Sequence, residues 1–203
     1  MRPVRPRVAP ADPESLTPEQ TRLLDGAEAL MGFKPNDGFT MARVPGLLEG
    51  ASGLVAAVFG GGQLDPEVRR LVAVMSSEAA GCRYCQAHTK HGALRDGIDP
   101  ARLQDFWNFE TSEAFTPAQR AAMKVAWLAS LTPNQVEDEH FTALSKHFSE
   151  EEVLEIVAVV ALFGFLNRWN DTLKTAVEAV PADRLAAEGI DQNSSETESQ
   201  EPP

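Results

Sequence analysis

The stretch Ser149–Leu166, which reads SEEEVLEIVAVVALFGFL, decides the fold class. Ser149 followed three residues later by Glu152 is a capping-box pattern, which marks the start of a helix. The segment Val153–Leu166 then carries one charge, Glu155, and is apolar nearly all round. At 14 residues this segment is too short to cross a bilayer. We therefore predict a long helix that is buried at the centre of a bundle or in a subunit interface.

Helix signals of the same kind recur on the N-terminal side of this stretch. Residues 17–20 (TPEQ) and 116–119 (TPAQ) each combine an N-cap threonine, a proline at the first helical position and a capping-box glutamine. Residues 35–38 (PNDG) predict a turn, and strand-like alternation is nearly absent. The sequence therefore predicts an all-α fold, a bundle of about seven to nine helices.

The composition indicates one domain with two irregular ends. The chain has 203 residues, of which 43% are hydrophobic, enough for a single core at residues 15–187. Residues 1–14 open with three arginines among prolines, and we expect a loose arm there. Residues 188–203 contain five acidic residues and no Lys or Arg, and we expect a disordered acidic tail.

The net charge of −12 excludes the usual classes of nucleic-acid-binding and anionic-membrane-binding proteins, because no positive field attracts phosphates. The first residues are followed by no apolar run of the kind that a secretory signal needs, so we expect a cytoplasmic protein. The chain has only two cysteines, separated by two residues. In a reducing compartment such a pair is usually catalytic or metal-binding.

The segment from Cys82 to His88 (CRYCQAH) carries the chemistry that the sequence offers. We expect the cysteines to open a helix, where unpaired N–H groups and the helix dipole favour a thiolate, the reactive form of cysteine. A spacing of three residues puts the sulfurs of Cys82 and Cys85 on one face. His88 lies three residues further and can accept a thiol proton. This gives a nucleophile, a resolving thiol and a base.

Two other interpretations of these residues stay open. Zinc could be bound by Cys82, Cys85, His88 and His91, but four ligands along one helix do not easily surround an ion, so we expect no metal and no other cofactor. The cysteines could also be small buried hydrophobic residues, with His88 as an ordinary core histidine.

Residues 78–89 (EAAGCRYCQAHT) resemble the alkyl hydroperoxidase D-like branch of the carboxymuconolactone decarboxylase family. The segments 44–48 (VPGLL) and 64–67 (LDPE) resemble its lead-in, and 163–171 (FGFLNRWND) resembles the closing helix of its peroxidase-related members. The resemblance covers roughly residues 40 to 175. It implies a homo-oligomer, a trimer or hexamer, that reduces small hydroperoxides with electrons from a thiol donor protein or small thiol.

The chain departs from the family pattern in two ways. The family often has a glutamate about three helical turns before the first cysteine, in a proton relay, where this chain has Arg69-Arg70. Glu78 and Glu155 are the candidate substitutes, and Arg70 could favour the thiolate by its charge. A buried Glu155 would need a partner. The family's histidine also often stands four residues after the second cysteine, one position beyond His88.

The sequence thus predicts a peroxidase-like thiol oxidoreductase with Cys82, Cys85, His88 and Glu78 in its site, and it leaves open which cysteine attacks. A lyase like carboxymuconolactone decarboxylase, using His88 and a carboxylate, is one alternative. A non-catalytic, redox-sensing oligomer is another. The polar cluster Asn167, Arg168, Asn170 and Asp171 is interpreted as the place where the apolar helix reaches solvent.

Overall fold

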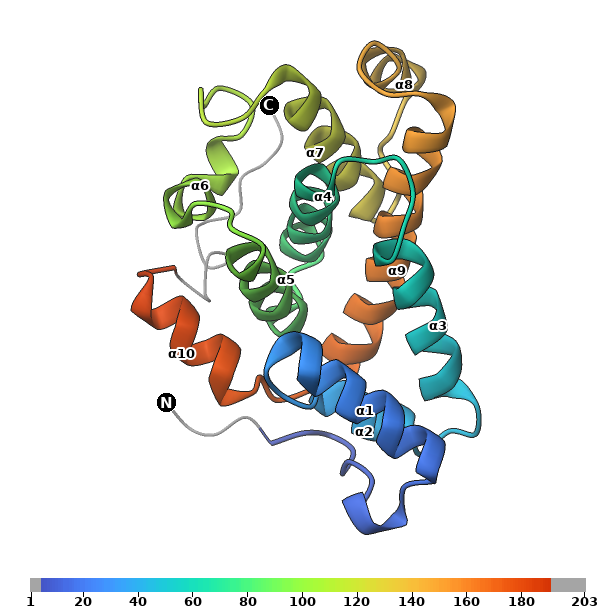
Figure 1. Cartoon of the computed structure of the whole chain (residues 1–203). Coiled ribbons are helices and arrows are strands. Elements are labelled where there is room, and N and C mark those ends of the chain that lie inside the picture. Colours follow the sequence, from blue (N-terminus) through green and yellow to red (C-terminus); the bar gives the residue numbers. More distant parts are fainter. Residues whose placement is uncertain (1–4, 191–203) are drawn as a thin grey trace.

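A computed structural model describes residues 5–190, and this part of the chain is all-helical, without a strand (Figure 1). The predicted fold class is confirmed. Ten α-helices, more than the predicted seven to nine, are present in the described residues. Their bounds are α1 Pro18–Met31, α2 Asn36–Met41, α3 Leu47–Phe59, α4 Pro66–Ala79, α5 Arg83–Arg95, α6 Pro100–Gln104, α7 Pro117–Ser130, α8 Asp138–Leu144, α9 Glu150–Leu173 and α10 Ala179–Ala187. Two 3-10 turns, Pro13–Ser15 and Phe106–Asn108, complete the set.

The helix starts lie where the capping patterns predict them. Thr17, Thr116 and Ser149 each accept a hydrogen bond from the backbone N–H three residues later, and the side chain at that position returns the bond. Each pair satisfies two N–H groups that the first helical turn leaves without an intrahelical partner. The starts of α1, α7 and α9 are therefore set by local sequence.

Helix α4 occupies the centre of the molecule, and α5, α7 and α9 pack around it (Figure 1). Its residues Leu71, Val72, Val74 and Met75 are fully buried. These side chains belong to one large core cluster that also contains both cysteines. The cysteine pair is thus part of the main core.

Helix α9 is only half buried in the single chain, which differs from the predicted burial all round. Ile156, Val159 and Leu162 face the core, but Leu154 is 69% exposed and Val157 is 41% exposed. Two arrangements were predicted for this helix, the centre of a bundle or a subunit interface. Of these, only the subunit interface leaves an apolar side of α9 exposed in the single chain. Within the described residues, no helix combines the length and the apolar character that a membrane crossing requires.

The predicted turn at residues 35–38 is wrong, because these residues begin helix α2. Asn36 anchors the segment by donating from its side chain to the carbonyl of Ala176, 2.9 Å away. Gly38 packs so closely on Leu24 that a Cβ there would clash with that side chain. The helix therefore depends on contacts with distant residues, which a local turn pattern does not encode.

The described parts of both predicted ends contact the body. In the predicted arm, the backbone N–H groups of Arg7 and Ala11 donate to the carbonyls of Leu173 and Phe39. In the predicted acidic tail, Ile190 is buried in the main core. Residues 1–4 and 191–203 lie outside the described residues, so those parts of the predicted arm and tail stay predictions.

Candidate active site

Cys82 and Cys85 lie at the junction between α4 and α5. Gly81 has a φ of +67°, which glycine adopts without strain, and the chain turns there from one helix into the next. Cys82 caps the N-terminus of α5, and its Sγ accepts a hydrogen bond from the N–H of Cys85 at 3.4 Å. The two Sγ atoms lie 2.9 Å apart in free, buried thiols. This geometry agrees with the predicted placement of both sulfurs on one face of a helix start.

The surroundings shift the two thiols in opposite directions. The pKa of Cys82 is lowered because the thiol and the N–H of Cys85 donate hydrogen bonds to its sulfur, against the opposing effects of burial and of the Asp171 and Asp37 carboxylates. The pKa of Cys85 is raised well above its ordinary value, because the thiol is buried and lies beside Cys82. Cys82 is therefore the sulfur that ionises first.

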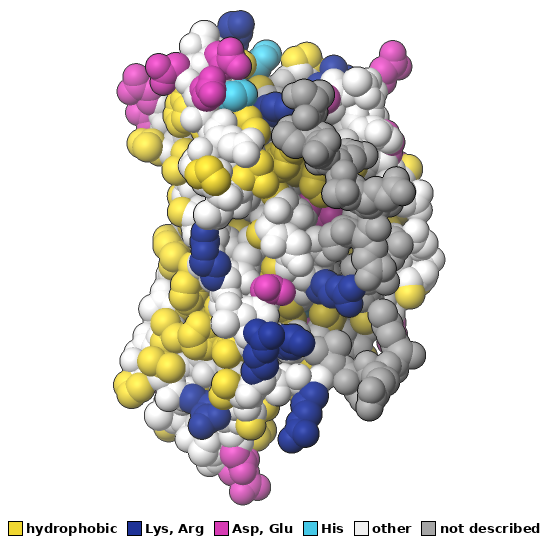
Figure 2. Space-filling view, turned by 180° about the vertical axis from the view of Figure 1, so that it is seen from behind, with side chains coloured by type: hydrophobic (Ala, Val, Ile, Leu, Met, Phe, Trp, Pro, Cys, Tyr) yellow, Lys and Arg dark blue, Asp and Glu magenta, His cyan; other side chains and the backbone are white. Residues whose placement is uncertain are grey.

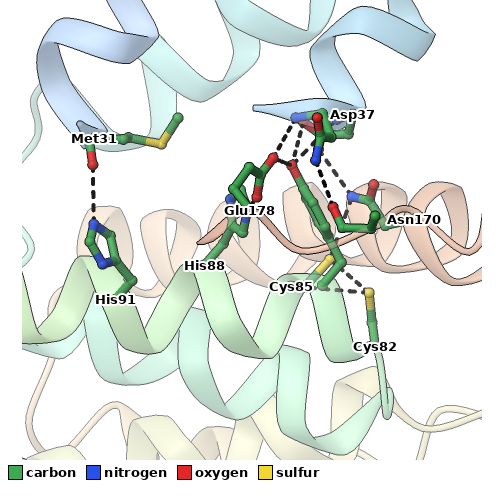
Figure 3. A network of polar contacts seen from close by, with 11 residues as sticks. Met31, Asp37, Cys82, Cys85, His88, His91, Asn170 and Glu178 are labelled. Carbon is green, nitrogen blue, oxygen red and sulfur yellow. Dashed lines mark hydrogen bonds and ion pairs between the residues drawn. The ribbon is translucent and has the colours of Figure 1, made fainter. Parts of the chain in front are cut away.

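Asn170 connects the thiols to a carboxyl group on α2 (Figure 3). Its side-chain Nδ2 donates to Asp37 Oδ2 at 3.0 Å and lies 3.6 Å from Cys85 Sγ. Burial raises the pKa of Asp37. A carboxyl group whose protonated form is favoured by burial therefore lies one amide away from the second sulfur.

Tyr84 connects Asp37 to a second carboxylate. The Tyr84 hydroxyl lies 3.2 Å from Asp37 Oδ1 and 2.9 Å from Glu178 Oε1. A hydroxyl has one proton, so it can donate to only one of these oxygens. Burial and the two neighbouring carboxylates raise the pKa of Tyr84 well above its ordinary value, so the hydroxyl keeps its proton. A protonated Asp37 can supply the proton for the second contact.

Glu178 is paired with His88 at the other end of this network. The distance from His88 Nε2 to Glu178 Oε2 is 2.6 Å, and the backbone N–H of Asn36 also donates to Glu178. Burial opposes ionisation of Glu178, but the hydrogen bond and the charge of His88 prevail and lower its pKa. The imidazole also stacks on Tyr84, with ring centroids 4.0 Å apart. We call the series Cys85, Asn170, Asp37, Tyr84, Glu178 and His88 the polar chain.

His88 therefore reaches the thiols through intermediaries, and no direct contact with a sulfur is present among the described residues. His91 lies one turn further along α5, and its Nε2 lies 3.1 Å from the carbonyl oxygen of Met31 (Figure 3). Burial lowers the pKa of His91. In the described part of the chain, no cluster of three or more His, Cys, Asp or Glu side chains is arranged to hold a metal ion.

Glu78, which the sequence proposed for a proton relay, has other partners. It forms an ion pair with Lys90 on α5 at 2.8 Å and accepts a hydrogen bond from the indole of Trp107 at 3.2 Å. Both partners of this ion pair are buried. The contacts found for Glu78 therefore join α4 to α5 without including either sulfur.

The other charged candidates also lie outside the polar chain. Glu155 is half-buried and has the partner that was predicted for it, because its carboxylate lies 2.6 Å from Arg69 and accepts the N–H groups of Gln63 and Leu64. Arg70 pairs with Asp96 at 2.6 Å. Asp96 caps the end of α5 opposite to Cys82, so the proposed effect of Arg70 on the thiols is wrong.

Sequence reasoning missed four members of the polar chain, and one of them, Tyr84, lies inside the cysteine motif but was given no role. Asp37 was assigned to a turn, and Glu178 follows α9 in a segment without a motif. Asn170 belonged to the cluster interpreted as solvent-facing, yet Asn167 and Asn170 are buried, while Arg168 and Asp171 are exposed. The usable signal was the resemblance of residues 163–171, which include Asn170, to a known family.

Comparison with known proteins places this geometry in a family. Residues 45–127 match the model of the carboxymuconolactone decarboxylase family. The protein YnjA of Escherichia coli (strain K12) is 28% identical over 110 residues, which cover 54% of this chain and 60% of YnjA. The chain thus spans less than two thirds of that relative's length.

Solved structures extend the similarity over nearly the whole chain. The debrominase Bmp8 is 34% identical with a TM-score of 0.81, and the match covers 88% of this chain and 96% of Bmp8. A cysteine-to-alanine variant of Bmp8, in complex with 2,3,4-tribromopyrrole, matches at 32% identity and a TM-score of 0.83, over 92% of this chain and 99% of that one. A peroxidase-related protein from Ralstonia eutropha JMP134 with the alkylhydroperoxidase AhpD core shares the fold at 24% identity and a TM-score of 0.75, covering 89% and 96%. The family model and the extended match to Bmp8 together show that this chain belongs to the carboxymuconolactone decarboxylase family.

Proposed function

We propose that the chain is a thiol-dependent oxidoreductase that reduces a small hydroperoxide while Cys82 and Cys85 pass from dithiol to disulfide. The observation that carries the proposal is the buried sulfur pair, 2.9 Å apart, in which the pKa of Cys82 is lowered and that of Cys85 is raised. One sulfur is thereby suited to attack, and the other keeps its proton until it resolves the product.

The reaction proceeds in two balanced steps. The Cys82 thiolate attacks the terminal oxygen of the hydroperoxide, the O–O bond breaks, and the alkoxide leaves while Cys82 becomes a sulfenic acid. The Cys85 sulfur then attacks Cys82, the S–O bond breaks, and water leaves as the disulfide forms. In total, a dithiol and a hydroperoxide give a disulfide, an alcohol and water. A dithiol reductant, protein or small molecule, restores the pair.

Both steps need protons, and the polar chain supports their supply. Burial raises the pKa of Asp37 and so favours its protonated form, and Asn170 joins it to Cys85. We propose that Asp37 donates a proton to the leaving group. A new proton then reaches Asp37 through Tyr84 from the His88–Glu178 pair at the edge of the site. In this proposal Glu78 positions α5 and takes no proton.

The test compares single serine variants in steady-state reduction of cumene hydroperoxide by dithiothreitol. Cys82→Ser should abolish turnover. Cys85→Ser should allow one sulfenic acid per chain, trapped with dimedone on Cys82, and no further turnover. Circular dichroism should show unchanged helicity for both variants. Activity retained in both variants would contradict the proposal and favour a lyase that uses no thiol.

Reductive debromination is a second candidate, favoured by the similarity to Bmp8 over nearly the whole chain. The same dithiol would give up two electrons, with a carbon–bromine bond replaced by carbon–hydrogen and bromide released beside the disulfide. Incubating the reduced protein with 2,3,4-tribromopyrrole and measuring bromide by ion chromatography distinguishes the candidates. Bromide release without hydroperoxide consumption would make debromination the function.

The proposal also covers the assembly, the location and the partners of the chain. We propose a homo-oligomer, a trimer or hexamer, in the cytoplasm, reduced by a thiol donor protein or a small thiol and acting on neither nucleic acid nor membrane. Sedimentation velocity tests the oligomer, and a single species of monomer mass would contradict it.

A further inference from the structure

Two adjoining cavities lie between α9 and the C-terminal end of α7. The larger has a volume of about 730 Å³ and the smaller about 360 Å³. The residues that line both cavities are Ala129, Val160, Gly164, Arg168 and Thr172. Because the cavities share this wall, we treat them as one feature and call it the α9 groove.

The two ends of the α9 groove differ in chemistry. Val157, Phe165 and Trp169 line the larger end, which is mainly apolar. The smaller end is more polar and is lined by Asn167 and Asp171 among others. A groove graded in this way fits a molecule with an apolar body and one polar end.

Asn167 provides the sharpest indication of a ligand. Only 4% of this residue is exposed, and its side-chain Nδ2 donates to the carbonyl of Ser76 at 3.0 Å. Its Oδ1 has no hydrogen-bond partner among the described residues. A buried acceptor without a partner is costly, which suggests that a donor from outside the chain completes it. The charges of Asp171 and Arg168, which both line this end, oppose each other, so a neutral N–H or O–H group fits best.

Neither cysteine lines the α9 groove, but its polar end approaches them, because the Asp171 carboxylate at that end acts on Cys82. This end is also lined by Ala79 and Ala80, and Ala80 stands two residues before Cys82. On α9, Asn170 contacts Cys85 Sγ less than one helical turn after Asn167. A ligand whose polar end meets Asn167 would therefore present that end toward the sulfur pair.

We propose that the α9 groove binds the organic part of the molecule that the thiols reduce, a neutral apolar body with one N–H or O–H donor that Asn167 Oδ1 accepts. This inference rests on the function proposed above. Gly164 is the position that tests it, because it borders both cavities and a Cβ there meets only Arg168, at an ordinary 3.5 Å.

The experiment measures binding without redox chemistry. Isothermal titration calorimetry on the full chain carrying Cys82→Ser uses two redox-inert probes, para-tert-butylphenol and its methyl ether, para-tert-butylanisole. The phenol should bind about fivefold more tightly, because only it donates a hydrogen bond. Gly164→Leu should weaken phenol binding at least about tenfold by filling the groove.

Two further variants serve as controls. Gly53→Leu makes the same change on α3 at an exposed glycine with open space around it, and it should leave binding unchanged. Asn167→Leu should still bind both probes but lose the preference for the phenol. Asn167→Leu also removes the hydrogen bond to Ser76, so the melting temperature of this variant is measured as a check of its folding. If Asn167→Leu does not fold, the comparison of Gly164→Leu with Gly53→Leu tests the inference.

Three outcomes would overturn the inference: no binding of either probe, equal binding by Gly164→Leu and Gly53→Leu, or an oligomer that Gly164→Leu dissociates, which would mean that a second copy covers the groove. Failure of the proposed function looks different, because hydroperoxide turnover would then survive both cysteine substitutions while the probes still bind as expected.

Discussion

The Tyr84 hydroxyl connects Asp37, the carboxyl group nearer to the thiols, with Glu178. This single hydroxyl lies within hydrogen-bond distance of Asp37 and Glu178. Asp37 has a raised pKa and Glu178 a lowered one, so a proton shared between them favours Asp37 over Glu178. Two carboxyl groups with such different proton affinities, joined by one hydroxyl, are suited to relay a proton.

At the residue scale, the proton role of Asp37 gives the first prediction. Only the ionised form of Asp37 raises the pKa of the cysteines, so Asp37→Asn should leave the pKa of Cys82 the same or lower. Turnover should nevertheless fall about 100-fold, because the proton donor is lost. Stopped-flow kinetics and a thiol titration on the same variant measure the two effects, with Asp37→Glu as the conservative control. A rate that follows the thiolate fraction alone would rule out a proton role.

Glu178 gives a prediction about stability and pH. Because its pKa is lower in the folded chain than in the unfolded one, its contribution is present above the unfolded value of about 4.3 and is lost as the pH falls through the folded value. Glu178→Gln should therefore lower the free energy of unfolding by about 2 kcal/mol at pH ~7, where it removes the carboxylate that contacts His88 Nε2. Urea unfolding across pH measures this, and the difference from the native chain should shrink below pH ~4. A difference that grows on acidification would contradict the assigned charge.

At the element scale, Glu78 and Lys90 fasten α4 to α5 through a buried ion pair. Glu78→Gln would leave Lys90 charged in a buried site, so the free energy of unfolding should fall by about 3 kcal/mol. Turnover per folded molecule should stay within about twofold of the native value, whereas loss of a relay group would cost about 100-fold. Denaturant unfolding and kinetics on the same preparation separate the structural role from the relay.

The sequence predicted those elements whose signals are local. The starts of α1, α7 and α9 follow from capping boxes, and the start of α5 follows from the expected capping by Cys82. Helices α2 and α10 were missed because distant contacts help to hold them in place. Asn36 at the start of α2 bonds to residues 140 and 142 positions away. Leu185 of α10 is buried in the main core.

At the scale of the whole molecule, one apolar surface remains exposed. Apolar side chains gather along one edge of the face seen from behind (Figure 2). The exposed large apolar residues of α3 and α9 are Leu54, Val55, Leu154 and Val157. Such a surface marks a contact site for a partner or ligand. The sequence identified the apolar helix, but only the assembled fold shows which of its sides the chain leaves uncovered.

The candidate site shows the same limit. The cysteines and His88 are within seven residues of one another and could be identified together. Asp37 and Asn170 are 133 positions apart, and only the packing of α2 and α9 around α5 brings them together. The thiol pair could therefore be predicted from the sequence, whereas the proposed proton path could not.

The main claim is that the pKa of Cys82 is lowered and that of Cys85 is raised. Titration of the two thiols by the ultraviolet absorbance of the thiolate tests it most directly. Serine at position 85 can still donate a hydrogen bond to Cys82, so Cys85→Ser should keep a thiol with a pKa below the ordinary value of ~8.5. Cys82→Ser should leave only Cys85, with a pKa above that value. A lowered thiol pKa in Cys82→Ser, or ordinary pKa values in both variants, would contradict the claim that Cys82 is the sulfur that ionises first.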